Sequence, residues 1–281
     1  MSKINTHPDY WPPKAYKNLD FLNSHEARQI RVLCELEEPE KRFRDENIED
    51  TIVMFGSART LPSRVAKRQL KELESTLASK KRLSAKDRES LRKAKTAVKN
   101  SPFYDSARNL SRDLTKWSMS LKDKRRRFIV CSGGGPGIME AANKGARIAG
   151  GASIGLGISL PFEQSLNPYI TKDLQFEFHY FFIRKYWFIY LAKALVVFPG
   201  GFGTMDELFE TLTLIQTLKL KKKIPIVLYG KEFWNNLLNF DVLLEYGVIS
   251  PKDVKLFKII DSVEEAKDYI VDFLTREYLE D

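Results

Sequence analysis

The sequence is poor in the residues that build disulfide frameworks and metal sites. Its 281 residues include two cysteines, Cys34 and Cys131, and three histidines, His7, His25 and His179. The cysteines lie far apart in the sequence and the histidines are scattered, so neither a disulfide scaffold nor a His/Cys site with recognisable ligand spacing is indicated. We therefore expect a protein of a reducing compartment that holds no metal.

Long apolar stretches are also lacking. Residues 1–14 contain no apolar segment of the kind found in signal peptides, and the most apolar stretch, residues 181–198, is interrupted by Arg184, Lys185 and Lys193. A membrane span needs roughly 18 or more consecutive apolar residues. The sequence predicts neither secretion nor a membrane anchor, and we expect a cytoplasmic location.

The composition is that of a globular protein, with an excess of positive charge confined to one segment. Hydrophobic residues make up 43% of the chain, and 46 Lys and Arg against 37 Asp and Glu give a net charge of +9. Residues 61–100 hold 13 Lys and Arg against 4 Asp and Glu, which accounts for the whole excess. Apolar residues at helical spacing, on both sides of a capping box at 84–87, predict an inserted helical hairpin there.

The basic hairpin has two interpretations. It could be an electropositive lid or patch that attracts polyanions, nucleic acid included. It could instead be a solvated hairpin whose lysines keep the chain soluble. No aromatic residue lies between the charges, as base stacking would require, and this favours the second interpretation.

Apolar runs of strand length alternate with helical patterns over most of the chain. The runs are almost continuously apolar, which is typical of strands buried on both faces. They are Thr51–Phe55, Arg127–Cys131, Ser153–Ile158, Leu174–Phe178, Ala194–Phe198 and Ile224–Tyr229. Helices are expected over 104–121, 138–149, 181–193, 205–218, 233–246 and 263–274. The alternation predicts an α/β fold, a doubly wound, mostly parallel sheet with helices on both faces.

This predicted nucleotide-binding domain covers residues 51–281, with 61–100 as the hairpin insertion, and residues 1–50 precede it. Prolines and aromatic residues within 1–22 predict an arm that packs by its rings without regular structure. A helix should follow from Ser24, with Ile30, Leu33 and Cys34 facing inward. A second, short and charged helix is expected through about Asp45.

Three predicted strands end in small-residue turns that lead towards a helix. The turns cover residues 55–59, 132–137 and 199–204 and should meet at the carboxyl edge of the sheet. Glycine lets the backbone approach a bound group, and a helix start offers amide donors and the positive end of its dipole. One such turn also serves a strand-to-helix connection without a ligand. Two that carry Ser or Thr hydroxyls favour a phosphorylated ligand.

Two common nucleotide-binding fingerprints do not fit. Ile138 occupies the position where a dinucleotide motif has its third small residue, although Glu163 lies where a ribose-binding acid could sit. No glycine is followed by Lys and then Ser or Thr, so a P-loop is excluded.

Charged residues surround the third turn in the sequence. Asp206, Glu207 and Glu210 follow it in the first turn or so of a helix, where the helix dipole alone would explain them. A helix start that binds phosphate should not also hold carboxylates unless one of them faces another part of the ligand, and we choose Glu207 for that role. Arg184 and Lys185 lie in a helix that is apolar almost all round. An inward arginine needs a carboxylate or phosphate partner, and the alternative is that both side chains reach the surface.

Taken together, these motifs resemble the LONELY GUY family, the cytokinin riboside 5'-monophosphate phosphoribohydrolases, often labelled "possible lysine decarboxylase". Residues 199–207 match its PGGxGTxxE signature, Arg184-Lys185 match its RK pair, and residues 132–143 match its GGGPGIMEAAN motif. The resemblance runs from about Ile52 to Tyr229, apart from the hairpin. It is closest to the longer bacterial branch, which shares Leu160-Pro161-Phe162-Glu163-Gln164 and Asn167.

The resemblance implies a Rossmann-like fold and a homodimer or higher assembly with composite sites. It also implies hydrolysis of a nucleoside 5'-monophosphate, AMP-like or a cytokinin ribotide, to free base and ribose 5-phosphate without metal or cofactor. The family's catalytic arginine and glutamate fall on Arg184 and Glu207. Its phosphate-binding and cleft-lining residues fall on Gly200, Gly201, Gly203, Thr204, Gly134 and Gly135, to which we add Ser57 and Glu163 as substrate-binding candidates.

Two features depart from the family's labels. Phe182-Ile183 stand where short plant-type members have His-Glu. No lysine lies in a context recognisable as a pyridoxal phosphate site, so the decarboxylase label has no chemical support. Two other classes of function stay open: a non-catalytic nucleotide or cofactor carrier on the same fold, and a nucleic-acid-associated protein acting through the hairpin.

Overall fold

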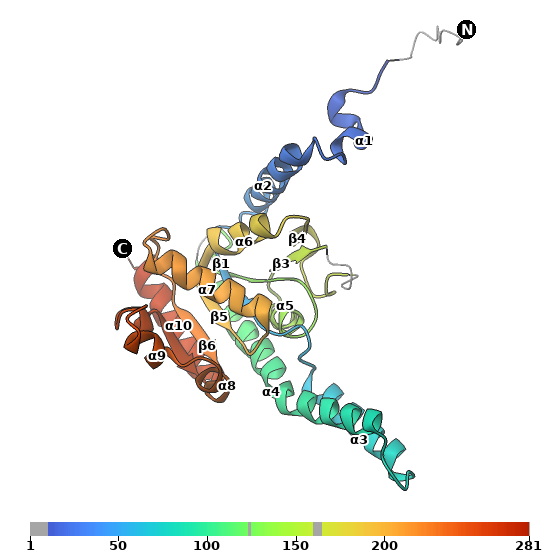
Figure 1. The fold of residues 1–281 in the computed structure, drawn as a ribbon. Coiled ribbons are helices and arrows are strands. Elements are labelled where there is room, and N and C mark those ends of the chain that lie inside the picture. The colour runs from blue at the N-terminus through green and yellow to red at the C-terminus, as the bar shows by residue number, and fades with distance from the viewer. Residues whose placement is uncertain (1–10, 123–124, 160–164, 281) are drawn as a thin grey trace, which may run out of the picture.

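The computed structural model describes residues 11–122, 125–159 and 165–280. Within these residues, seven strands form one parallel sheet in the order β4-β3-β2-β1-β5-β6-β7 (Figure 1). The strands are β1 (Thr51–Phe55), β2 (Ile129–Ser132), β3 (Ser153–Ile158), β4 (Gln175–Phe178), β5 (Ala192–Val197), β6 (Ile226–Tyr229) and β7 (Phe257–Ile260). The expected doubly wound, Rossmann-like α/β class is confirmed.

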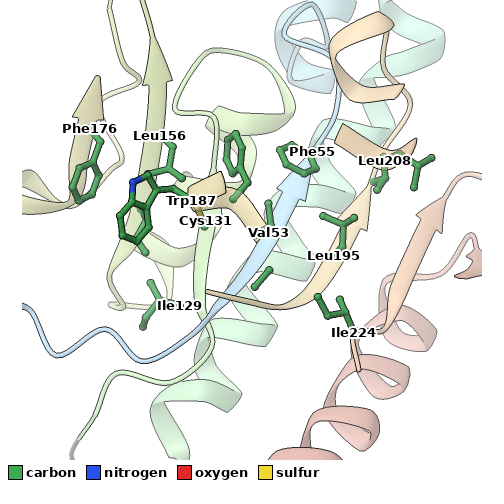
Figure 2. Packing of buried hydrophobic residues seen from close by; sticks show 14 of the residues in the cluster. Val53, Phe55, Ile129, Cys131, Leu156, Phe176, Trp187, Leu195, Leu208 and Ile224 are labelled. Carbon is green, nitrogen blue, oxygen red and sulfur yellow. The ribbon is translucent and has the colours of Figure 1, made fainter. Parts of the chain in front are cut away.

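Helices cover both faces of the sheet because strand side chains point alternately into two apolar cores. In β1, Ile52 and Met54 enter one core, and Val53 and Phe55 enter the other, part of which is shown in Figure 2. The first core is covered by α4 (Ala85–Ser120), α5 (Ile138–Ile148) and α10 (Val263–Tyr278). The second is covered by α2 (Arg28–Asp45), α6 (Phe181–Tyr190), α7 (Phe202–Gln216) and α8 (Lys231–Leu237). Complete burial of strands such as β1 explains their almost continuously apolar sequences.

Two elements near the C-terminus differ from the sequence-based expectation. The edge strand β7 was not predicted, because it is short and only partly buried, with Lys258 exposed. The single helix expected over 233–246 is two helices, α8 and α9 (Phe240–Glu245), and the Asn239 side chain caps α9 by accepting a hydrogen bond from the Val242 amide. A 3-10 helix, η3 (Asp253–Leu256), leads into β7, and another, η2 (Lys172–Leu174), leads into β4.

The basic hairpin is formed by α3 (Ser63–Ala78) and the first half of α4, and it projects away from the sheet (Figure 1). Ser84 and Asp87 form the expected capping box at the start of α4. We expected one helix to end before Tyr104 and another to begin there. Instead, α4 is a single helix of 36 residues that continues through Pro102. Proline removes the amide that would bond the Val98 carbonyl, and the Ser101 hydroxyl donates to that carbonyl at 2.9 Å instead.

The N-terminal region corrects two expectations. Residues 1–10 of the arm lie outside the described residues. Its described part contains short helices, η1 (Ala15–Lys17) and α1 (Leu19–Leu22), and the rings there are exposed rather than packed, with Trp11 85% exposed. In α2 the predicted inward residues Ile30, Leu33 and Cys34 lie outward instead. The core-facing residues are Val32, Leu36 and Phe43, which recur at helical spacing on the other side of the helix.

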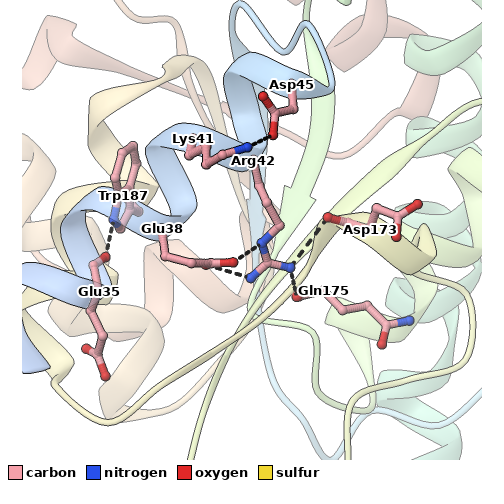
Figure 3. Close-up of polar contacts among 8 residues, drawn as sticks. All are labelled: Glu35, Glu38, Lys41, Arg42, Asp45, Asp173, Gln175 and Trp187. Carbon is pink, nitrogen blue, oxygen red and sulfur yellow. Dashed lines mark hydrogen bonds and ion pairs between the residues drawn. The ribbon is translucent and has the colours of Figure 1, made fainter. Parts of the chain in front are cut away.

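Helix α2 is also one helix where two were expected, although it contains Pro39. The Glu35 carbonyl, which loses its amide donor to this proline, accepts a hydrogen bond from Trp187 Nε1 in α6 at 2.9 Å (Figure 3). Farther along α2, Arg42 donates to the Gln175 carbonyl at 2.8 Å and so ties the helix to the start of β4. No helix in the described residues has the length and hydropathy needed to cross a bilayer.

Candidate active site

The candidate site lies where the winding of the sheet reverses. From β1 the chain winds outward through β2, β3 and β4, and it then returns to place β5 on the other side of β1. At such a point the turns that follow neighbouring strands diverge and leave a crevice at the carboxyl edge. The turns after β1 and β5 are joined there by a hydrogen bond of 3.0 Å from the Ser57 amide to the Pro199 carbonyl.

A cavity of 660 Å³ occupies this crevice. It is lined by Phe55, Gly56, Ser57, Ala58, Arg59, Gly133, Met139, Ile158, Phe181, Arg184, Phe188, Gly201, Phe202, Gly203, Thr204 and Glu207. One part of the lining is backbone and hydroxyl, contributed by the turns, and another part is aromatic and aliphatic. A pocket of this size and lining suits a ligand with an anionic end and a flat, largely apolar end.

The polar part of the lining is the start of α7. This helix begins at Phe202, earlier than the expected Met205, and its N-cap, Gly201, makes no side-chain cap. Met205 is the first residue of the helix whose amide bonds a backbone carbonyl, that of Gly201, at 3.0 Å. The preceding amides belong to cavity-lining residues, and they present the donors and the positive dipole end that favour an anion.

The glycines of this turn are not equivalent. A Cβ atom added at Gly201 or Gly203 would meet no atom within 4 Å, so these positions face open space on the cavity side. A Cβ at Gly200 would lie 2.1 Å from Thr204 Oγ1. Gly200 is therefore needed for packing inside the turn, whereas Gly201 and Gly203 leave room for a ligand.

Glu207 faces the cavity from the second turn of α7, because the helix begins at Phe202 and has no acid in its first turn. The helix dipole acts mainly within the first turn, so it does not account for this carboxylate. Glu207 is 4% exposed, and its Oε1 lies 3.9 Å from Arg184 Nη2. Its Oε2 has no hydrogen-bond partner in the described part of the chain.

The pKa of Glu207 is raised to about 7. Burial is the main cause, since it penalises the charged form, and the nearby Glu210 and Asp206 charges add to it. The Lys185 and Arg184 charges act in the opposite direction without overcoming burial. A carboxyl group with this pKa exchanges protons readily at neutral pH, which suits acid–base chemistry.

The two cations of α6 are both largely buried, and they do different things. The Arg184 guanidinium lines the cavity and lies 4.9 Å from the Phe181 ring centroid. Lys185 is not part of the lining; its ammonium contacts Asp206 at 2.8 Å and Glu210 at 3.1 Å. Burial lowers the pKa of Lys185, but these hydrogen bonds outweigh that effect and the net pKa is raised. Lys185 thus fixes α6 against α7 while Arg184 faces the ligand space.

The glycine turn after β2 contributes less than expected. Gly133 lines the main cavity, whereas Gly134 is buried behind it with a φ of +73° and Gly135 lines a neighbouring cavity of 80 Å³. At the start of the α5 helix that follows, one amide is already occupied, because the Ile138 amide donates to the Ser57 carbonyl at 3.1 Å. The start of α7 is therefore the better anion site of the two.

The structure brings together Ser57, Arg184, Gly201, Gly203, Thr204 and Glu207 from the sequence-predicted set. Gly200 lines an adjoining cavity, and Glu163 lies outside the described residues. Sequence reasoning did not single out Arg59 or the aromatic wall of Phe181 and Phe188, because the helical pattern of α6 does not say which rings border a cavity.

A buried polar network that supports the site was also missed. Asn167 Nδ2 donates to the Gly134 carbonyl at 2.9 Å and to Asn143 Oδ1 at 2.9 Å, and the Ser132 hydroxyl donates to the same Asn143 oxygen at 2.7 Å. The signal was present, since all three residues lie in the matched motif segments. Among the described residues, no group of three or more His, Cys, Asp and Glu side chains is arranged to hold a metal ion.

A family model and several known proteins match parts of the chain. The family model described as "Possible lysine decarboxylase" matches residues 139–270. Over 175 residues the chain is 27% identical to a cytokinin riboside 5'-monophosphate phosphoribohydrolase of Arabidopsis thaliana, a match that covers 61% of this chain and 74% of that protein. These matches agree with the resemblance to the LONELY GUY family that the sequence motifs show.

Other known proteins match shorter parts of the chain. A pyrimidine/purine nucleotide 5'-monophosphate nucleosidase of Escherichia coli K12 is 29% identical over 119 residues, which cover 37% of this chain and 25% of that one. The chain spans only 35% to 40% of the length of the first curated relatives that it matches. The solved structure of a molybdenum cofactor carrier protein from Chlamydomonas reinhardtii covers 81% of this chain and 99% of that chain at 19% identity, with a TM-score of 0.43. That likeness is too low to bear on function.

Proposed function

We propose that this protein hydrolyses the N-glycosidic bond of a nucleoside 5'-monophosphate and releases the free base and ribose 5-phosphate. The observation that carries the proposal is the position of Glu207. This buried carboxyl group with a pKa near 7 lines the same cavity as the uncapped start of its own helix. The names of the Arabidopsis and Escherichia coli relatives describe the same bond cleavage.

In the proposed complex, the 5'-phosphate binds at the amides of residues 201–204 and at the Thr204 hydroxyl. The base lies against the apolar wall that includes Phe181, Phe188 and Met139. The ribose then lies between them, and its anomeric carbon faces Glu207. Binding energy from the phosphate positions the sugar, which lowers the entropic cost of reaction.

Cleavage proceeds through a transition state in which positive charge develops on the ribose ring. Ionised Glu207 stabilises this charge and accepts a proton from the water that attacks C1'. The base departs with the electron pair of the broken bond and takes up a proton from solvent. Arg184, at 3.9 Å from the Glu207 carboxylate, orients that carboxylate and supports its ionised form.

The test is an assay of base release from AMP, GMP, CMP, UMP and isopentenyladenosine monophosphate. We expect Glu207→Gln to retain the fold and to lower kcat by roughly 10²- to 10⁴-fold, the usual contribution of a catalytic base. Arg184→Ala should lower kcat by on the order of 10²-fold. The comparison across the five nucleotides identifies the preferred base, including the cytokinin ribotide.

Glu264→Gln is the matched control, because it makes the same change at an exposed acid of α10 that does not line the cavity. Its kcat should stay within a few-fold of the wild-type value. An unchanged rate in Glu207→Gln would refute the catalytic assignment. Binding of a monophosphate without base release from any of the five would instead identify a nucleotide carrier.

A further inference from the structure

A second cavity, of 540 Å³, lies between the turn after β5 and the basic hairpin. It is lined by Ser57, Arg59, Thr60, Arg92, Lys93, Thr96, Ala97, Asn100, Pro199, Gly200 and Phe233. The lining residues from α4, at 92–100, come from the part of the helix that precedes Pro102. The inserted hairpin therefore borders the candidate site and is not only a remote projection.

The lining of this cavity is basic and rich in hydrogen-bond donors. Arg59, Arg92 and Lys93 contribute cations, three hydroxyls and the Asn100 amide add polar groups, and no Asp or Glu is among its lining residues. Arg92 and Lys93 each pair with Glu89 of their own helix, at 2.9 Å and 3.5 Å, but both side chains are more than 70% exposed. Exposed ion pairs within a helix are weak, so an entering anion can compete with them.

The two cavities adjoin each other across the turn. Ser57 and Arg59 line both of them. Residues 201–204 line the first cavity and residues 199–200 line the second. A ligand whose first phosphate lies at the start of α7 can thus place a further phosphate beside Arg59 and the hairpin cations.

We propose that the second cavity is a phosphate subsite that takes the second phosphate of a nucleoside 5'-diphosphate. This inference rests on the proposed function, since it uses the same position for the first phosphate. It extends the ligand class from nucleoside monophosphates to diphosphates, and it gives Arg92 and Lys93 a binding role. Hydrolysis of such a ligand would add water across the C1'–N bond and give free base and ribose 5-diphosphate.

The experiment compares the dissociation constants of AMP and ADP by calorimetry in the Glu207→Gln background, where turnover does not deplete the ligand. We expect ADP to bind roughly tenfold more tightly than AMP, a gain typical of charge-assisted contacts at a partly exposed site. In Arg92→Ala/Lys93→Ala the ratio of the two constants should fall to about 1. Arg92→Lys/Lys93→Arg, which keeps both charges, should retain most of the preference.

Lys81→Ala/Arg82→Ala is the matched control, because it removes the same charge from the turn between α3 and α4, outside both cavities. It should keep the preference for ADP. Equal affinities for AMP and ADP in the parent, or an ADP preference that survives Arg92→Ala/Lys93→Ala, would overturn the proposal. If inorganic phosphate added with AMP binds through Arg92 and Lys93 while ADP gains nothing, the cavity is a separate anion site and the diphosphate assignment is wrong.

Binding is measured separately from base release, so the two proposals fail separately. An ADP preference that depends on the hairpin, without base release, supports the subsite and refutes the enzyme. Base release from AMP without any ADP preference supports the enzyme and refutes the subsite. Folding of each variant is checked by circular dichroism and thermal unfolding.

Discussion

At neutral pH the Glu207 carboxyl is close to the midpoint of its titration, because burial raises its pKa to about 7. The proposed reaction needs the ionised form. We therefore predict that kcat/KM for base release rises with pH and levels off above about 7, with a tenfold loss per pH unit well below that value. The measurement is kcat/KM from pH 5 to pH 9.

The substrate phosphate also titrates, with a second pKa of about 6. Glu207→Gln separates the two contributions, because the pH profile of its residual activity should show only the ionisation of the substrate phosphate. A wild-type profile that is flat between pH 6 and pH 8 would contradict the role of Glu207 as a base.

The same raised pKa predicts a pH-dependent cost in stability. An unfolded glutamate ionises near its ordinary value of 4.5, while Glu207 in the folded protein holds its proton up to about pH 7. Between these values the folded state binds more protons, so this group's contribution to the free energy of unfolding falls as pH rises, by about 3 kcal/mol in all. The free energy of unfolding of Glu207→Gln, taken relative to that of wild type, should thus rise by about 3 kcal/mol between pH 4.5 and pH 8. Urea unfolding measures it. A pH-independent difference would show that the carboxyl is not perturbed.

Among single residues, the sequence identified those whose chemistry is tied to a local motif. Glu207, Arg184, Gly201 and Gly203 fall in short signatures, and they meet at one cavity, while Gly200 lines the adjoining cavity. Arg59 could not be found in this way, because only the packing of the β1 turn against the β5 turn brings it to the border of both cavities.

At the scale of elements, a substitution at the start of α7 should raise the stability of the protein while it weakens substrate binding. Gly203 is the second residue of the helix, and a Cβ there meets nothing within 4 Å. Gly203→Ala should therefore raise the free energy of unfolding by about 0.5–1 kcal/mol, through helix propensity and lower entropy of the unfolded chain. The same methyl group enters the proposed phosphate space, so KM for AMP should rise by about tenfold or more.

Gly200→Ala is the contrasting variant. Its Cβ would lie 2.1 Å from Thr204 Oγ1, so this change should lower stability. If Gly203→Ala leaves KM unchanged, the helix start does not bind the phosphate.

The α2 helix gives a second prediction at this scale. Trp187 Nε1 bonds the Glu35 carbonyl that Pro39 leaves without an amide donor. Trp187→Phe should leave that carbonyl unsatisfied and cost about 1–3 kcal/mol beyond the change in packing. Pro39→Ala restores an amide donor to the carbonyl, so the loss caused by Trp187→Phe should shrink by about 1 kcal/mol in that background. Urea unfolding of the four proteins measures the coupling, and strict additivity would contradict it.

The two prolines also show why helix boundaries were predicted less well than strands. The buried strands are local patterns, and β1 and β3 have the bounds that the apolar runs indicated. Whether a helix continues through proline depends on which group donates a hydrogen bond to the carbonyl that the proline leaves without an amide donor. At Pro102 the donor is the adjacent Ser101, but at Pro39 it is Trp187, which is far away in the sequence and signalled by no local pattern.

At the scale of the whole molecule, the hairpin and the N-terminal helices extend from opposite ends of the sheet domain (Figure 1). The charge pattern and the capping box were enough to predict the hairpin. They could not show that its second helix continues across the sheet and borders a cavity beside the site, because that depends on the helix running on through Pro102.

Apolar side chains exposed on the N-terminal helices and on α6 lead to a prediction about assembly. Leu19 is 68% exposed and Leu33 is 56% exposed, and on the adjoining α6 Phe182 is 54% and Tyr190 is 52% exposed. Monomers rarely leave large contiguous apolar surface uncovered. The family resemblance also implies a dimer or higher assembly, so we predict that the protein self-associates through these helices at micromolar concentration.

Light scattering after size-exclusion chromatography measures the assembly. Leu33→Lys/Tyr190→Lys should reduce the mass to that of one chain, whereas Val248→Lys, at a site 64% exposed on the segment after α9, should not. Phe181 lies on α6 and also lines the cavity, so pairing through α6 would place a second copy beside the ligand. Dissociation should then raise KM for AMP. A monomeric wild-type protein with full activity would show that this surface serves neither assembly nor the site.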